Sequence, residues 1–128
     1  MNRERQTPIP VTLVTGPSAA AREAAIAAVL GGAAPAGSAI LLEGLPDGAG
    51  RLDTIAAACG LQLARIAPGC LCCSGNLTMR VTLNRLLRRN PPRLYIGIAT
   101  ATHLDTIHDF LSQPPYADLL SLTAPIVA

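Results

Sequence analysis

Three cysteines stand within four residues of this sequence, at Cys70, Cys72 and Cys73. An apolar run typical of a buried strand precedes them, and residues with helical spacing follow, so the thiols come just before a predicted helix. A helix N-terminus lowers the pKa of a thiol, and thiolates bind soft or borderline cations such as zinc and copper(I). Because zinc takes four ligands in a tetrahedron, we expect one more group, and His103 is the best candidate within the chain.

Two other interpretations of the cysteines stay open. Cys70 and Cys73 have the Cys-x-x-Cys spacing of thiol-disulfide oxidoreductases, in which two thiols interconvert with a disulfide. Cys72 argues against that use, because a third thiol between the pair would scramble the exchange. Cysteine is also a common small residue of protein cores, and we expect Cys59, which stands alone, to be a core residue for that reason.

Strands and helices alternate along the chain and predict an α/β fold, a single three-layer domain with a mainly parallel sheet. Apolar, β-branched runs favour strands, and apolar residues at helical spacing favour helices. The predicted strands cover residues 9–15, 38–43, 61–66 and 94–99, and the predicted helices cover 20–30, 51–59, 74–89 and 104–111. Loops that follow parallel strands gather at the carboxyl edge of the sheet. We therefore expect residues 16–23, the cysteine segment and residues 100–105 to lie there together.

The length and composition limit the number of domains and exclude several kinds of function. With 128 residues, 50% of them hydrophobic and 14% charged, the chain fits one folded domain over residues 1–128, with a flexible start over 1–8. It has no lysine, which rules out Schiff-base chemistry, and its net charge of +2 is too small to indicate nucleic acid or a membrane surface. The uncharged run 24–42 contains glycine and proline and predicts helix, turn and strand rather than a membrane span, so we expect a cytoplasmic protein.

Charged residues after the cysteines predict a polar surface rather than a second site. Asp105, His108 and Asp109 fall on one predicted helix, and we expect them to be surface residues because no nucleophile can be matched to them. A basic strip precedes them, which we interpret as a solvated helix face. Docking to an acidic partner is favoured over nucleic acid, since stacking aromatics are scarce there. The strip consists of Arg80, Arg85, Arg88, Arg89 and Arg93.

Two runs of the sequence, 11–16 and the Gly-Cys-x-Cys-Cys run 69–73, resemble the CobW family of P-loop GTPases. The resemblance extends over about residues 10–111, and Glu43 falls where the family carries an Asn-Glu-Phe-Gly segment. Members of this family use GTP binding to control the binding and transfer of a metal, and the cysteine motif holds zinc or cobalt. The resemblance thus implies a P-loop NTPase-like fold with zinc or a similar transition metal on the three cysteines.

The nucleotide half of the family pattern is incomplete. A phosphate loop reads Gly, four residues, then Gly-Lys-Ser/Thr, and after Gly16 this chain carries Ala21, Arg22 and Glu23 at the last three positions. We expect Gly16 and Arg22 to keep at most a weak anion or nucleotide site, whereas Glu23 would set a carboxylate where phosphate and magnesium meet. The sequence also lacks the Asn-Lys-x-Asp segment that reads guanine. We therefore do not expect GTP to be bound or hydrolysed.

Together these residues predict a truncated, CobW-like pseudo-GTPase that binds zinc and acts as a metallochaperone, metal sensor or regulator, with no catalytic residue. The expected partners are a second copy of the chain, an intact CobW-type protein and an unidentified metal recipient; a second chain could supply the fourth ligand. Two alternatives stay open. One is a thiol-disulfide oxidoreductase that uses Cys70 and Cys73, and the other is an atypical GTP-binding protein.

Overall fold

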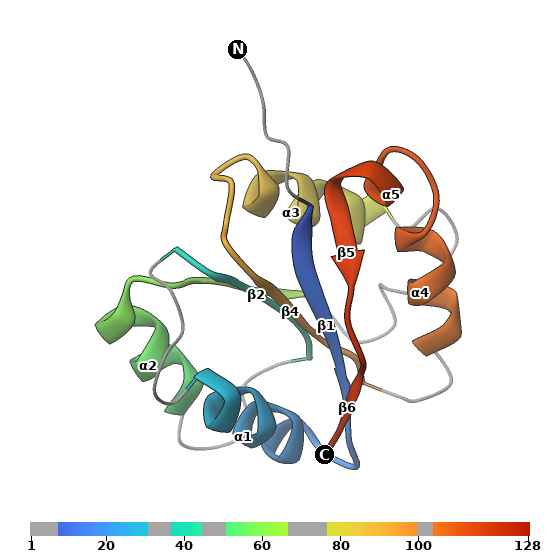
Figure 1. Ribbon diagram of the computed structural model, residues 1–128. Coiled ribbons are helices and arrows are strands. Elements are labelled where there is room, and N and C mark those ends of the chain that lie inside the picture. The colour runs from blue at the N-terminus through green and yellow to red at the C-terminus, as the bar shows by residue number, and fades with distance from the viewer. Residues whose placement is uncertain (1–7, 31–36, 45–50, 67–76, 100–103) are drawn as a thin grey trace.

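The computed structural model describes residues 8–30, 37–44, 51–66, 77–99 and 104–128 (Figure 1). All the predicted strands and helices are present, and α2 and α4 have the predicted bounds. The flexible start predicted over residues 1–8 lies, except for Pro8, outside the described residues. In chain order the elements are β1 (Ile9–Thr15), α1 (Ala19–Leu30), β2 (Ala39–Glu43), α2 (Arg51–Cys59), β3 (Gln62–Ile66), α3 (Leu77–Leu87), β4 (Leu94–Gly97), α4 (Leu104–Leu111), α5 (Tyr116–Leu119), β5 (Leu120–Leu122) and β6 (Ile126–Val127).

The strands form one parallel sheet in the order β3-β2-β4-β1-β5, and β6 also pairs with β1. At the centre Ile96 of β4 lies beside Leu13 of β1 and Leu41 of β2. β5 and β6 follow one another along the other side of β1, with Leu122 beside Val11 and Ile126 beside Val14. The mainly parallel sheet is therefore confirmed, with β3 at one edge and the β5–β6 segment at the other.

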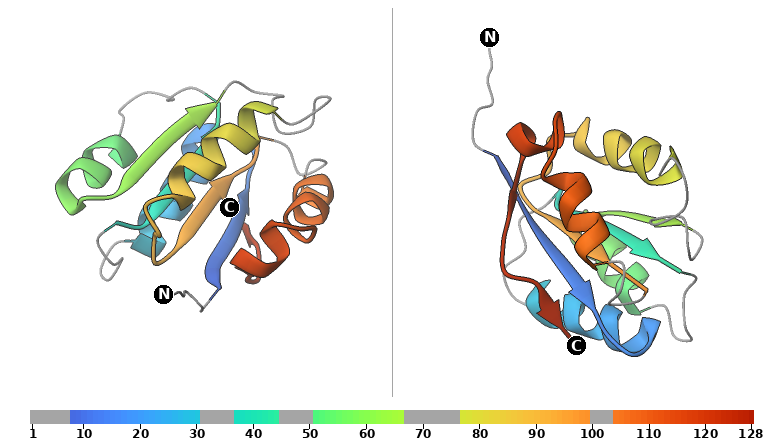
Figure 2. Two further views of the ribbon diagram at one scale, coloured as in Figure 1. Left: turned by 90° about the horizontal axis from the view of Figure 1, so that it is seen from above. Right: turned by 90° about the vertical axis from the view of Figure 1, so that its right-hand side faces the viewer.

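Helices cover both faces of the sheet, which gives the predicted three-layer architecture (Figures 1 and 2). On one face, α1 and α2 bury Ile26, Leu30 and Leu52 against the strands. On the other face, α3, α4 and α5 cover a larger cluster that includes Met79 and Ile107. Successive strand residues enter the two clusters in alternation, because side chains of a strand point to opposite faces. The arrangement is consistent with a P-loop NTPase-like domain.

Two local features shape the carboxyl edge of the sheet. The hydroxyl of Ser18 accepts a hydrogen bond from the Ala21 N–H (3.1 Å), which caps α1 directly after β1. At the end of β4, a Cβ on Gly97 would lie 2.9 Å from Cδ2 of Leu42 and 3.8 Å from Cδ1 of Ile26. Glycine at this position therefore leaves room for the side chains of Leu42 in β2 and Ile26 in α1.

Several predicted bounds differ from the structure by one or two residues, and one predicted burial is wrong. α3 ends at Leu87 rather than at residue 89, because the Asn90 N–H donates to the Leu87 carbonyl (2.8 Å) and Asn90 adopts φ 54°, a left-handed conformation that commonly ends a helix. β4 ends at Gly97 instead of residue 99. The prediction that Cys59 belongs to the core is wrong: it is exposed at the last position of α2, where the chain turns at Gly60 (φ 70°).

The uncharged run 24–42 is divided between α1 and β2 in its described parts, as the glycine and proline residues predicted. None of the described helices is long and apolar enough to cross a membrane. The basic strip also agrees with its prediction, since all five arginines are exposed. Asp105, His108 and Asp109 are exposed on α4, which confirms their assignment to the helix surface.

Candidate functional site

The carboxyl ends of β1, β4 and β2 are joined by hydrogen bonds of two buried charged side chains. Nη1 of Arg22, in α1, donates to the carbonyl of Gly16 (3.1 Å) and to the carbonyl of Ala99 (3.3 Å). The backbone N–H of Ala99 in turn donates to Oε1 of Glu43 at 2.7 Å. These four residues, which we call the carboxyl-edge cluster, connect three neighbouring strands through α1.

The two charged side chains of the carboxyl-edge cluster are buried. The exposed fractions are 7% for Arg22 and 2% for Glu43. A buried charge is costly unless hydrogen bonds compensate it, and here backbone carbonyls and a backbone N–H provide them. The carboxyl ends of β1, β2 and β4 are therefore held together by hydrogen bonds of buried groups.

The predicted pair Gly16 and Arg22 is brought together in the structure. The turn after β1 is also closely packed: a Cβ on Gly16 would lie 2.8 Å from Cβ of Ala128 and 3.2 Å from Cγ of Arg22. Ala128 is held there because its N–H donates to the Thr15 carbonyl at 2.7 Å. The guanidinium of Arg22 thus donates to the carbonyl of the same turn whose glycine would open a phosphate loop. Anion binding at this pair stays a prediction.

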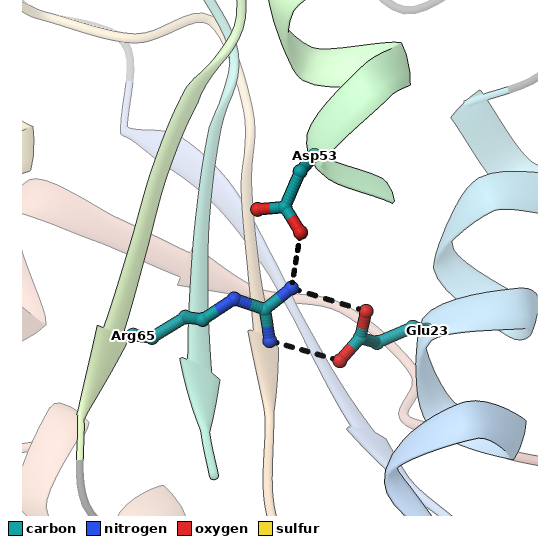
Figure 3. Close-up of polar contacts among 3 residues, drawn as sticks. All are labelled: Glu23, Asp53 and Arg65. Carbon is teal, nitrogen blue, oxygen red and sulfur yellow. Dashed lines mark hydrogen bonds and ion pairs between the residues drawn. The ribbon is translucent and has the colours of Figure 1, made fainter. Parts of the chain in front are cut away.

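Glu23 does not lie where the comparison with a phosphate loop predicted. We expected its carboxylate at the place where phosphate and magnesium meet, but it forms an ion pair with Arg65 of β3 (Figure 3). Nη1 and Nη2 of Arg65 donate to the two Glu23 oxygens at 2.9 and 3.2 Å. Nη2 also donates to Oδ2 of Asp53 in α2 at 3.0 Å. The sequence alone could not show this pairing, because the partners come from three different elements.

The electrostatics of Arg65 follow from these contacts. Hydrogen bonding to Glu23 raises the pKa of the Arg65 guanidinium, and Asp53 acts in the same direction, while burial opposes both. The side chains of Arg65 and Glu23 are only 15% and 14% exposed, so this pair is shielded from water, whereas Asp53 is 44% exposed. The ion pair connects the N-terminal half of α1 to the carboxyl end of β3.

The predicted metal ligands Cys70, Cys72, Cys73 and His103 lie outside the described residues. Within the described ranges, no group of three or more histidine, cysteine or acidic residues is arranged to hold a metal ion. The strands that lead to the predicted ligands are described, however. β3 and β4 are parallel neighbours of β2 and end at the same edge of the sheet. The meeting of the segments that follow these strands stays a prediction.

The sequence analysis missed two contacts at this edge of the sheet, the pairing of Arg65 and the hydrogen bond of Glu43. In both cases a charged residue in an apolar strand was the signal that a partner is needed. A lone arginine in the apolar strand around Arg65 has to be paired when the strand is covered on that face, so an acidic partner was foreseeable. Glu43 was noticed for its resemblance only, and its bond to the Ala99 N–H depends on the β2–β4 pairing. Residue type gave the need for a partner in both cases, and the tertiary fold provided the partner.

Comparison with known proteins relates part of the chain to a metal-handling protein. Over 68 residues the chain is 40% identical to the zinc chaperone YeiR of Escherichia coli (strain K12). The match covers 52% of this chain and 21% of YeiR, so the chain spans about a fifth of that relative's length. No family model and no solved structure matches the chain. About half of the chain is thus similar to part of a zinc chaperone.

Proposed function

We propose that this chain is a zinc-binding, CobW-like protein that acts as a metallochaperone, metal sensor or regulator and does not hydrolyse GTP. The observation that carries the proposal is the 40% identity to the zinc chaperone YeiR over 68 residues. The proposed ligands are Cys70, Cys72 and Cys73, with His103 as the fourth. Three thiolates and one imidazole suit the tetrahedral coordination that zinc prefers.

The sheet topology supports this ligand set. Because β2 separates β3 from β4, the ends of those two strands are about 10 Å apart, twice the spacing of paired strands. Cys70 follows Ile66 by four residues and His103 follows Ala99 by four residues, and a residue of extended chain spans about 3.3 Å. Both segments are therefore long enough to bring a thiolate and an imidazole to one ion without any change in the sheet.

The contacts of α1 support the absence of GTP hydrolysis. A phosphate loop uses its lysine to hold the β- and γ-phosphates and its hydroxyl residue to bind magnesium. Here Arg22 donates to the carbonyls of Gly16 and Ala99, and the carboxylate of Glu23 is paired with Arg65. Arg22 and Glu23, which stand at the lysine and hydroxyl positions of the phosphate-loop pattern, thus form hydrogen bonds to other groups of the protein.

Three thiolates on one chain also suit metal transfer. If His103 leaves the ion, the fourth coordination position becomes available to a ligand from another protein. A second copy of this chain, an intact CobW-type protein or a metal recipient could provide that ligand. We therefore include these partners in the proposal.

Zinc titration tests the ligand set. Wild type, Cys72→Ser and Cys59→Ser are purified under reducing conditions, and their zinc affinity is measured by competition with a chromophoric chelator. Cys59 is an exposed thiol outside the motif, so its substitution is the matched control. We expect Cys72→Ser to weaken zinc binding by about a hundredfold or more, and Cys59→Ser to change it by less than about twofold. Equal affinity of wild type and Cys72→Ser would refute the proposed ligand set.

The same preparations separate the alternatives. Chain that holds almost no metal but rapidly forms a Cys70–Cys73 disulfide would favour a thiol-disulfide oxidoreductase. Calorimetry with GTP and magnesium addresses nucleotide binding, and a dissociation constant in the micromolar range would show that the altered loop still accepts GTP.

A further inference from the structure

A basic groove lies at the edge of the sheet, away from the carboxyl-edge cluster. It has a volume of about 460 Å³ and is lined by residues 60–64 on one side and by Arg85, Leu86 and Arg89 on the other. In Figure 2 (left), α3 runs over the face of the sheet next to β3, the strand at the edge. We call this groove, between β3 and the C-terminal end of α3, the β3–α3 groove.

The β3–α3 groove carries positive charge that the described part of the chain does not neutralise. Residues 77–93 contain five arginines and no aspartate or glutamate. Arg85 and Arg89 line the groove and are exposed, and neither forms an ion pair with another described residue. The lining itself contains no acidic residue. The groove is therefore complementary to a ligand with negative charge.

The outer backbone of β3 forms one wall of this groove. The Gln62 N–H donates to the Ser38 carbonyl (2.9 Å), and the Ile66 carbonyl accepts from the Gly44 N–H (2.8 Å), so these two residues face β2. Backbone groups of a strand alternate in direction, so the N–H and carbonyl of Leu63 face away from the sheet. Within the described ranges, no strand pairs with β3 on that side. An unpaired edge of this kind can bind an extended peptide by adding a strand.

We propose that the β3–α3 groove binds an extended acidic segment of a partner protein, which pairs with the outer edge of β3 and forms ion pairs with Arg85 and Arg89. A peptide satisfies both features of the groove, because its backbone can pair with Leu63 and its carboxylates can contact the arginines. Nucleic acid offers the negative charge but no strand backbone. A second copy of this chain would bring its own Arg85 and Arg89 toward the same two arginines, which opposes pairing through this edge.

The two walls also define the pattern of the bound segment. Side chains of an added strand alternate between the two faces of the sheet. On one face they would meet the arginines at the end of α3, and on the other they would lie beside Leu61 and Leu63, which pack against the apolar cluster under α1 and α2. The matching segment therefore alternates acidic and apolar residues.

The position of the groove is compatible with an exposed carboxyl edge. The lining of the groove includes residues 60–64, at the amino end of β3, whereas the carboxyl-edge cluster lies at the opposite ends of the strands. A bound segment would thus leave the carboxyl edge uncovered. The inference does not depend on the proposed zinc site.

Fluorescence anisotropy with labelled peptides tests the proposal on the full chain. The probe is an eight-residue peptide in which Glu and Val alternate, compared with a Gln-Val peptide and an eight-nucleotide oligothymidine. The variants are Arg85→Glu and Arg89→Glu, with Arg88→Glu as matched control. Arg88 lies on the same exposed helix end and its reversal changes the net charge equally, but it does not line the groove. Circular dichroism confirms that each variant is folded.

We expect saturable binding of the Glu-Val peptide, about tenfold weaker binding by Arg85→Glu and by Arg89→Glu, and less than a twofold change for Arg88→Glu. N-methylation of alternate backbone nitrogens of the peptide should abolish binding in one of the two registers and spare it in the other. Any of four results overturns the proposal: no saturable binding up to about 1 mM peptide, an equal loss in Arg88→Glu, tighter binding of the oligothymidine, or a dimer that Arg85→Glu dissociates.

Discussion

Replacement of Arg22 by methionine measures what the carboxyl-edge cluster contributes to the fold. Methionine keeps most of the apolar stem that packs near Gly16 but removes the guanidinium, so the carbonyls of Gly16 and Ala99 lose their side-chain donor. An unsatisfied buried polar group costs about 1–3 kcal/mol. Because Arg22 is 7% exposed and water has little access, we expect a loss of about 2–4 kcal/mol in the free energy of unfolding. For a chain of this size, that corresponds to a decrease in Tm of about 8–16 °C.

Urea unfolding followed by circular dichroism gives the free energy, and thermal unfolding gives the Tm. Arg88→Met is the matched control: Arg88 is exposed, so its substitution should change the free energy of unfolding by less than about 0.5 kcal/mol. If Arg22→Met is as stable as Arg88→Met, the guanidinium does not hold the strand ends together. If wild type but not Arg22→Met gains stability from added pyrophosphate, the guanidinium serves an anion instead of the two carbonyls.

The Arg65–Glu23 ion pair and Tyr116 allow two further tests. Arg65→Met and Glu23→Gln, singly and together, form a double-mutant cycle. We expect a coupling free energy of about 1 kcal/mol, because the ion pair is bidentate and mostly shielded from water. Urea unfolding of the four proteins measures this coupling, and a value near zero would contradict the structure. Burial raises the pKa of Tyr116, which is 3% exposed. A raised folded-state pKa contributes stability that is present below the ordinary value of about 10 and is lost as the pH rises through the folded-state pKa. Tyr116→Phe should therefore lose stability less steeply than wild type between about pH 9 and 11, and equal slopes would refute this assignment.

The fold was predictable from the sequence wherever a helix or strand has a regular pattern of buried apolar residues. α4 repeats apolar residues at helical spacing, with Ile107 and Leu111 buried, and β1 is a mostly apolar, β-branched run that is followed by Gly16 and Pro17. β5 and β6 were not predicted, because they have three and two residues and show no periodicity. Their position is determined by pairing with β1, a long-range contact that no local pattern expresses.

The sequence predicted which residues lie at one edge of the sheet. It did not predict the directions in which their side chains point. The sequence placed Gly16, Arg22 and Glu23 after the first strand, and the structure confirms that place. Which side chain meets which partner depends on the neighbouring strands. Arg65, the partner of Glu23, is 42 residues away along the chain, and Ala99, a partner of Arg22, is 77 residues away.

Consecutive residues of α1 thus connect opposite parts of the sheet. Arg22 joins the ends of β1 and β4, whereas Glu23 reaches across to Arg65 near the end of β3. The N-terminal half of α1 therefore connects strand ends on both sides of β2, including the two strands that lead to the proposed zinc ligands. In a phosphate loop the lysine and the hydroxyl residue of this turn contact the phosphates and the magnesium of the nucleotide. Here the same turn is held by internal hydrogen bonds, so a zinc site supported by these strand ends would have a geometry that does not depend on GTP.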